Sequence, residues 1–298
     1  MLGAAAGGGL PQWNCNCRNC SGARLGKIPA LTQSSVAIGD ELGNWFLINA
    51  SPDLPAQIAA CPSLQPRSTP LRNTPIAGVL LTNADLDHTL GLLSLREGGR
   101  LKIYATKAVR EAVDVCPGVT AIMEAFGGVT WEEPPEDALG ALRGANGVES
   151  SVRFRAIRLP GKPPKFAKGI APSGGHSVAY QLVDARTGGK LLVAPDVAGL
   201  NEALQTAMVE SDAVLFDGTF WSSDELAQVK DRAASAAEMG HVTIKDCSLA
   251  LLGGLSAARK IYIHINNTNP VLSPGSPERA AVEAAGIVVG FDGLEFEL

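Results

Sequence analysis

The chain has 298 residues, of which 46% are hydrophobic and 18% charged, and its formal net charge is -5. This is the composition of an ordinary soluble protein, and the absence of a basic cluster argues against nucleic acid or an anionic membrane surface as partner. No apolar run approaches the roughly 20 residues that span a bilayer, and the first ten residues lack the pattern of a signal peptide. We therefore expect a cytoplasmic protein whose partners are small molecules or other proteins.

Strand and helix patterns alternate along the chain. Residues 32–38 and 45–49 predict paired strands around a Gly39-Asp40 turn. Residues 132–147, rich in Pro, Glu and Gly, predict an exposed connection. The remaining predicted strands are 77–81, 101–105, 152–159, 177–183, 190–194, 213–216 and 261–265, and the predicted helices are 107–115, 200–209 and 248–259. This alternation favours an α/β fold in which helices cover the outer faces of sheets.

Potential metal ligands follow a predicted buried strand that ends at Leu81. The next residues present Asn83, Asp85, Asp87 and His88 within six positions. Open α/β layers place their sites at the carboxyl ends of strands, and carboxylates and imidazoles are metal ligands. The alternative for this segment alone is a helix start with a polar cap and first-turn carboxylates.

Other strand borders favour the metal-site interpretation. The chain has only four histidines, and three of them, His88 included, lie at predicted strand borders. The fourth, His241, follows a Met-Gly pair in a predicted loop. The further potential ligands at strand borders are His176, Asp196, Asp217 and His264. Because several such borders offer ligands, the sequence predicts a metalloprotein.

A second cluster contains half of the six cysteines, at Cys15, Cys17 and Cys20. The other three cysteines stand alone, which is not a disulfide framework. A Cys-x-Cys-x-x-Cys motif binds a soft or borderline cation such as zinc, although free or redox-active thiols are the alternative. We predict a structural zinc that holds the glycine-rich start of the chain against the core. Asn267, shortly after His264, is the predicted fourth ligand.

The order of ligand segments resembles the metallo-β-lactamase superfamily, whose first motif is His-x-His-x-Asp-His and whose later ligands are a His, a bridging Asp and a final His. Here the first motif reads Asn-x-Asp-x-Asp-His over residues 83–88. Other motifs are similar to those of the PqqB family of pyrroloquinoline quinone (PQQ) biosynthesis. They include AAGGG-x-PQWNC-x-C at 5–17, FDGT at 216–219 and HINNTNP at 264–270.

The resemblance implies a single αββα sandwich domain over residues 1–298 and a role in PQQ biosynthesis. It implies an iron-dependent hydroxylase that acts on the tyrosine ring of a Glu-Tyr-derived precursor, with other PQQ-pathway proteins as possible partners. The oligomeric state is open, and a homodimer is one possibility. Carboxylate and amide oxygens in place of two imidazoles favour Fe(II) or manganese over zinc at the active site.

The resemblance also suggests roles for individual residues. His88, His264 and either Asp85 or Asp87 would form a two-His-one-carboxylate face with open positions. His241 and Asp217 would act as catalytic groups that orient ligands or carry protons. The competing enzyme is a two-metal hydrolase whose site His176, Asp196 and His264 complete. The non-enzyme alternative is a carrier that binds the quinone or its precursor in the same pocket.

Overall fold

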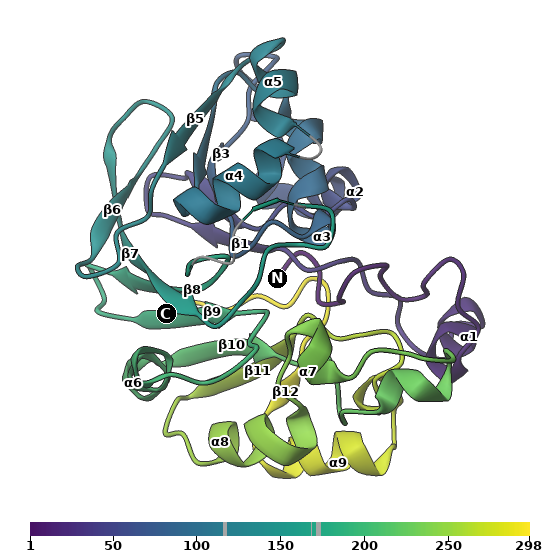
Figure 1. The fold of residues 1–298 in the computed structure, drawn as a ribbon. Coiled ribbons are helices and arrows are strands. Elements are labelled where there is room, and N and C mark those ends of the chain that lie inside the picture. The colour runs from purple at the N-terminus through teal and green to yellow at the C-terminus, as the bar shows by residue number, and fades with distance from the viewer. Residues whose placement is uncertain (116–117, 168, 171–173) are drawn as a thin grey trace.

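The computed structural model describes residues 1–115, 118–167, 169–170 and 174–298. Its strands form two sheets (Figure 1). The first has the order β1-β2-β3-β4-β5 and the second β12-β11-β10-β9-β8-β7-β6. The strands are β1 (Val36–Gly39), β2 (Trp45–Ile48), β3 (Ile76–Leu80), β4 (Leu101–Tyr104), β5 (Val129–Glu132), β6 (Gly140–Arg143), β7 (Glu149–Leu159), β8 (Ser177–Asp184), β9 (Lys190–Ala194), β10 (Ala213–Asp217), β11 (Arg259–Ile263) and β12 (Val288–Val289).

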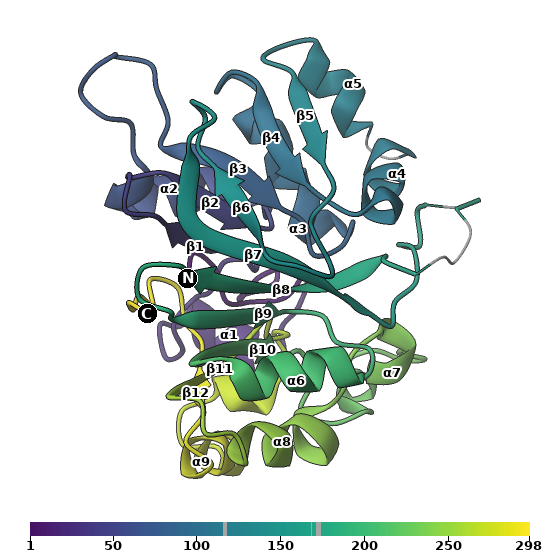
Figure 2. The same cartoon turned by 90° about the vertical axis from the view of Figure 1, so that its left-hand side faces the viewer.

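Helices lie on the outer sides of both sheets (Figures 1 and 2). The α-helices are α1 (Arg18–Arg24), α2 (Leu54–Ala60), α3 (Leu86–Thr89), α4 (Lys107–Val115), α5 (Val119–Glu124), α6 (Glu202–Glu210), α7 (Ala236–Met239), α8 (Leu249–Gly253) and α9 (Pro277–Ala284). In Figure 1, α4 and α5 accompany the first sheet in the upper half, while α6, α8 and α9 lie along the second sheet in the lower half. Among the described residues, no helix has both the length and the apolar character needed to cross a bilayer.

Alternation along the strands builds three hydrophobic layers. In β2, Phe46 and Ile48 point between the two sheets, whereas Leu47 points to the other side, because successive side chains of a strand face opposite ways. The layer on the outer side of the first sheet includes Val113 of α4 and Met123 of α5. The corresponding layer outside the second sheet includes residues of α6, α8 and α9. The predicted αββα sandwich is confirmed.

The carboxyl ends of parallel strands from both sheets meet along one side of the sandwich. In the first sheet, β2, β3, β4 and β5 are parallel, and in the second, β9, β10, β11 and β12 are parallel. The N-terminal segment joins the two halves, because Ala5 bridges to Gln33 on one side and to Ile265 on the other. Loops from both sheets are thereby held next to each other.

All nine predicted strands are present, and the helix at 107–115 has the predicted bounds. The exposed connection predicted at 132–147 is wrong in part, because β6 lies within it and pairs with β7. The helix predicted at 248–259 is shorter in the structure, where α8 covers only Leu249–Gly253. It follows directly on a π-helical turn, η4 (Ile244–Ser248). No prediction was made for β5, β12 or α9.

Candidate metal centre

The strand ends deliver polar side chains to one buried cluster. Asp87 and His88 lie on α3, which begins a few residues after β3. Asp196 follows β9, and His264 comes directly after β11. His241 lies in the loop after α7, where Gly240 ends the helix in a left-handed conformation with φ of 91°. Segments far apart in sequence thus converge because their strands end at the same edge.

Two groups of candidate ligand atoms share His264. One group is Asp87, His88 and His264, and the other is Asp196, His241 and His264; within each group all the ligand atoms lie within 4.8 Å of one another. His264 Nε2 is 3.2 Å from Asp87 Oδ2 and 3.6 Å from Asp196 Oδ1. Asp196 links both groups, since its Oδ2 is 3.5 Å from His88 Nε2 and its Oδ1 is 3.7 Å from His241 Nε2. Three imidazoles and two carboxylates therefore face a common point.

The environment of His88 fits a bound cation. The ring is fully buried, and its Nε2 makes no hydrogen bond to any residue that the structure describes. A buried polar atom without a partner is costly, and this one faces the carboxylates of Asp87 and Asp196. A divalent metal ion would bind the Nε2 lone pair and neutralise both carboxylates, so the residues present fit such an ion.

The carboxylates dominate the electrostatics of the cluster. Burial opposes a charge on His264, but Asp196 and then Asp87 outweigh it and raise the pKa of this ring to about 10. Loss of hydration, followed by repulsion from Asp87 and Asp196, raises the pKa of the Asp85 carboxyl to about 6. The cluster thus has an excess of negative charge, which favours binding of a cation.

Asp217 holds the ring of His241 through its Nδ1 atom. It is fully buried, and its Oδ2 lies 2.8 Å from His241 Nδ1. The same oxygen accepts a hydrogen bond from Val197 N, while Oδ1 accepts from the backbone and hydroxyl of Thr219. Burial works against protonation of His241, but the charge of Asp217 exceeds that effect and raises the pKa of the ring. Asp217 therefore fixes the ring so that Nε2 points toward Asp196.

A second cluster lies at the start of α1. Cys15, Cys17 and Cys20 have their sulfur atoms within 4.8 Å of one another. The Nδ2 atom of Asn267 is 3.2, 3.6 and 3.2 Å from these three sulfurs in that order. Asn19 supports the arrangement by donating to the backbone oxygen of Asn267.

The position of the Asn267 amide matches the fourth corner of a tetrahedron. Ligands at about 2.3 and 2.0 Å from a tetrahedral zinc lie roughly 3.5 Å apart, close to the distances from this amide to the sulfurs. Oxygen and nitrogen of an amide exchange places on a simple flip, after which Oδ1 would face the sulfurs. Burial raises the pKa of the Cys20 thiol to about 11, so a cation is needed to hold it as the thiolate at neutral pH. The four residues fit zinc.

Comparison with known proteins identifies the family. A family model described as a beta-lactamase superfamily domain matches residues 44–265. Coenzyme PQQ synthesis protein B of Ectopseudomonas mendocina (strain ymp) is 42% identical over 305 residues, which cover 100% of this chain and 99% of that protein. The crystal structure of Zn²⁺-bound PqqB from Methylobacterium extorquens matches with a TM-score of 0.89 and 36% identity, covering 100% of this chain and 98% of that one. The chain belongs to the coenzyme PQQ synthesis protein B family.

More distant structures show the fold alone. A diphosphatase of the PhnP family matches with a TM-score of 0.67 at 18% identity, covering 100% of this chain and 95% of that one. The superfamily fold is that of metal-dependent, hydrolase-like enzymes, but the reaction has to be argued from the site.

Within this family member, the predicted site residues are only partly brought together. His176 is buried but belongs to neither group of ligand atoms found among the described residues. Asp85 also lies outside both groups found among the described residues, and its backbone is held by Asn83, His88 and Thr89. Asp87 is thus the carboxylate that faces His88 and His264. His241, predicted only as a catalytic group, also lies in a ligand group.

Several residues of the site are not among those predicted from the sequence. Thr82 and Thr219 each contact Nδ1 of a centre histidine. Gly7 lies against Asp87, where an added Cβ would be 3.2 Å from Oδ2. The backbone of the glycine-rich segment thus approaches Asp87 closely at this point. Their positions are the one feature of the sequence that could have indicated these threonines, because each follows the end of a strand that borders the site.

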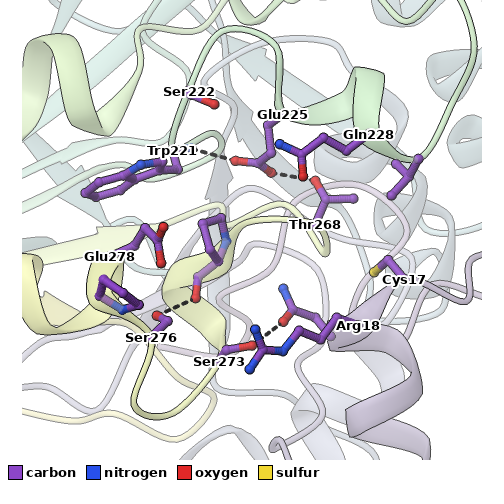
Figure 3. A pocket seen from close by; sticks show the side chains of 14 residues that line it. Cys17, Arg18, Trp221, Ser222, Glu225, Gln228, Thr268, Ser273, Ser276 and Glu278 are labelled. Atoms are coloured by element: carbon purple, nitrogen blue, oxygen red, sulfur yellow. Dashed lines mark hydrogen bonds between the residues drawn. The ribbon is translucent and has the colours of Figure 1, made fainter.

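A cavity of about 400 Å³ lies beside the cysteine cluster and is lined by residues of α1, of the segment after β10 and of the segment after β11 (Figure 3). Glu225 borders it and is nearly buried. Its carboxylate accepts hydrogen bonds from Trp221 N and from the Thr268 hydroxyl, both drawn in Figure 3. Thr268 follows Asn267 directly, so this carboxylate anchors the segment that carries ligands of both clusters.

Proposed function

We propose that this chain takes part in coenzyme PQQ synthesis as an iron-dependent hydroxylase that acts on the tyrosine ring of a Glu-Tyr-derived precursor. The observation that carries the proposal is the buried Nε2 of His88, which has no hydrogen-bond partner among the described residues and faces two carboxylates. Membership of the coenzyme PQQ synthesis protein B family supports the role in PQQ synthesis, and the ligand chemistry supports iron as the metal. Two carboxylates beside imidazoles, with no thiolate, suit iron or manganese better than they suit a structural zinc.

The ligand set we propose is Asp87, His88 and His264, with Asp196 and His241 on the adjoining side. A ferrous ion bound there would supply open positions at which dioxygen and the phenol ring meet. Asp87 and Asp196 are only half-buried, so the protein leaves one side of the cluster accessible to a substrate. The precursor and any pathway protein that delivers it would approach from this side.

A single metal ion is favoured over a pair. Asn83 Oδ1 accepts the backbone N–H of Asp85, which fixes the orientation of the amide, and Nδ2 then donates to Asp196 Oδ2 at 3.0 Å. An N–H donor stands where the superfamily motif has an imidazole ligand, and a donor cannot bind a metal. His176, one of the three residues expected to complete a two-metal site, lies outside both ligand groups found among the described residues.

His241 and Asp217 supply a route for a proton. Nδ1 of His241 is held by the buried Asp217, and Nε2 points toward Asp196 at the accessible side. A histidine held in this way can accept a phenolic proton at Nε2 while Asp217 stabilises the resulting imidazolium. We therefore assign His241 the role of general base, with that of a metal ligand as the alternative.

The test is to load anaerobically purified protein with ferrous iron, remove the excess, and measure metals per chain. We expect one zinc and one iron. Hydroxylation places one oxygen atom of O₂ in the product and reduces the other to water with two electrons, so the assay contains ascorbate. With the Glu-Tyr-derived precursor, we expect substrate-dependent oxygen uptake and a product heavier by one oxygen atom.

Two matched variants locate the metal. His88→Ala should lose iron and oxygen uptake while keeping zinc, whereas His176→Ala should keep all three. Two metals at the centre with oxygen-independent turnover would identify a hydrolase. Tight binding of the quinone without conversion of the precursor would identify a carrier.

A further inference from the structure

We propose that Thr82 and Thr219 are positioning residues, each of which fixes the ring of one metal-binding histidine so that Nε2 presents its lone pair to the metal. Thr82 serves His88 and Thr219 serves His264. The inference rests on the proposed metal centre but on no particular reaction there. It concerns which ring nitrogen carries the hydrogen, a property that decides which nitrogen can bind a metal.

Thr219 is placed to accept a hydrogen bond from His264. Its Oγ1 lies 2.8 Å from His264 Nδ1, 2.7 Å from Asp217 Oδ1 and 2.9 Å from the backbone oxygen of His264. The hydroxyl has one hydrogen to donate, and both oxygen neighbours can only accept. The nearest, Asp217 Oδ1, is a carboxylate oxygen and the strongest acceptor of the three. The hydroxyl hydrogen therefore goes to Asp217, and Oγ1 accepts from Nδ1–H. Nε2, which faces Asp87 and Asp196, is then the nitrogen that gives up its hydrogen when a metal binds.

Thr82 has an equivalent arrangement around His88. Its Oγ1 is 3.2 Å from His88 Nδ1. Asn49 Oδ1 accepts the backbone N–H of Thr82 at 2.9 Å, which fixes the amide orientation, and the same oxygen lies 3.2 Å from Oγ1. Asn49 Nδ2 donates to Oγ1 at 2.9 Å, which occupies one of the two lone pairs of the hydroxyl and leaves the other for the ring. The hydroxyl thus has an acceptor for its own hydrogen other than the ring. Oγ1 can then accept from Nδ1–H, so the Nε2 that lacks a partner within the described chain carries the lone pair.

The two threonines occupy matching places in the two halves of the sandwich. Thr82 follows β3 of the first sheet by two residues, and Thr219 follows β10 of the second sheet by two residues. Both side chains are essentially buried. Each is tied to an acceptor that is itself held by backbone, Asn49 at one end of β2 and Asp217 at the end of β10. Each sheet thereby contributes one ligand histidine together with the hydroxyl that orients it.

A purely structural role is the competing explanation, because both threonines also contact backbone or loop side chains. Thr219 Oγ1 reaches the backbone oxygen of His264, which has a strained left-handed φ of 54°. Such a role predicts lost stability without a selective loss of metal affinity. A positioning role predicts the reverse. Loss of a partner behind a metal-binding histidine typically weakens metal binding by about 10- to 100-fold.

The experiment compares Thr82→Val and Thr219→Val with Thr82→Ser and Thr219→Ser. Valine keeps the branched shape and removes the hydroxyl, while serine restores it. Thr243→Val is the matched control, because Thr243 is also buried and hydrogen-bonded, but to Asp246 and to no histidine. The measurement is the dissociation constant for Mn²⁺ at the centre, from free Mn²⁺ detected by electron paramagnetic resonance, with zinc retained at the cysteine cluster. Unfolding in denaturant is measured on every variant.

We expect each valine variant to bind Mn²⁺ about 10- to 100-fold more weakly than the parent, and each serine variant to recover to within a few-fold. The control should bind as the parent does. Parent-like Mn²⁺ affinity in folded valine variants, or serine variants as weak as valine, would overturn the inference. If the parent protein bound no Mn²⁺, or bound Mn²⁺ that was retained in His88→Ala, the proposed metal centre itself would be wrong. That outcome differs from parent-like affinity in the valine variants, so the two failures are distinguishable.

Discussion

The cysteine cluster and the histidine–carboxylate centre differ in the hardness of their ligands and in their access. The first presents three sulfurs, with an amide already at the fourth corner. The second presents nitrogen and oxygen ligands, and its two carboxylates are half-buried. A closed tetrahedral set suits a structural metal, whereas a catalytic metal needs an open position. The two ligand sets thus suit different roles, a structural metal at the cysteine cluster and the proposed catalytic metal at the histidine–carboxylate centre.

The two sites nevertheless share one segment. His264 belongs to the centre, and Asn267, three residues later, belongs to the cysteine cluster. The N-terminal segment runs from the centre at Gly7 to the cysteines. A change at the structural site is therefore expected to reach the centre through these segments, while a change at the centre should leave the structural site intact. The variants below test that asymmetry.

The largest effect is expected from Cys20→Ser. Cys20 is fully buried, and its loss removes one of the three sulfur ligands. Where free zinc exceeds the dissociation constant 1,000-fold, bound zinc stabilises the folded state by about 4 kcal/mol. We expect zinc to fall from one per chain to none and the free energy of unfolding to fall by about that amount or more, as measured by urea denaturation with elemental analysis.

Cys61→Ser is the matched control, since Cys61 is half-buried and lies outside the cluster. It should keep its zinc and nearly all its stability. The asymmetry requires in addition that His88→Ala keep its zinc. A Cys20→Ser protein with unchanged unfolding would mean that the cysteine cluster is not the structural site.

An intermediate effect is expected from Glu225, which anchors the shared segment through Thr268. Burial raises the pKa of this carboxyl from its ordinary value of 4.5 to about 7. Between these pH values the folded chain holds a proton that the unfolded chain has lost, so the free energy of unfolding falls as the pH rises from about 4.5 to 7. The gap corresponds to at most roughly 3.5 kcal/mol, at about 1.4 kcal/mol for each pH unit.

Glu225→Gln removes the titrating group and should flatten the unfolding free energy across this pH window, as measured by urea denaturation at several pH values. Glu278→Gln, a change on the wall of the same cavity, controls for the loss of one negative charge there and should keep the parent's pH dependence. An unaltered slope in Glu225→Gln would show that another group causes it.

The sheets and the chemistry of the centre were predictable from the sequence for a definite physical reason. Runs such as residues 77–81 are apolar because the strand is buried on both faces, and such runs are visible without neighbours. Polar residues directly after them had to lie at one edge once the strands were parallel. Asp87, His88, Asp196 and His264 could be found in that way. The Asn267 amide also lies where the fourth ligand was predicted, beside the three sulfurs.

What the sequence could not give depends on distances between loops. His241 and His176 are equally good ligands as residue types, and only the path of the chain brings His241 toward Asp196. The threonines behind the histidines have no periodic signal, because a hydroxyl at a strand end more often caps a turn. β6 was not predicted because Gly140 and Ala141 carry little strand propensity, and pairing with β7 decides their conformation.

The smallest effect is expected from Gly7→Ala, which tests whether the N-terminal segment positions a ligand of the centre. An added Cβ would lie 3.2 Å from Asp87 Oδ2 and 3.3 Å from its Cγ, so the carboxylate must move by a few tenths of an ångström. Overpacking of this kind costs about 1–3 kcal/mol, and a part of it at the ligand would weaken Mn²⁺ binding by up to about tenfold. Gly253→Ala, whose Cβ would meet only Ala285 at 3.6 Å, should bind Mn²⁺ as the parent does. Zinc content should be unchanged in both variants. An equal Mn²⁺ affinity in the two variants would mean that Asp87 can move without weakening the metal centre. The centre would then be independent of the segment that leads to the cysteines.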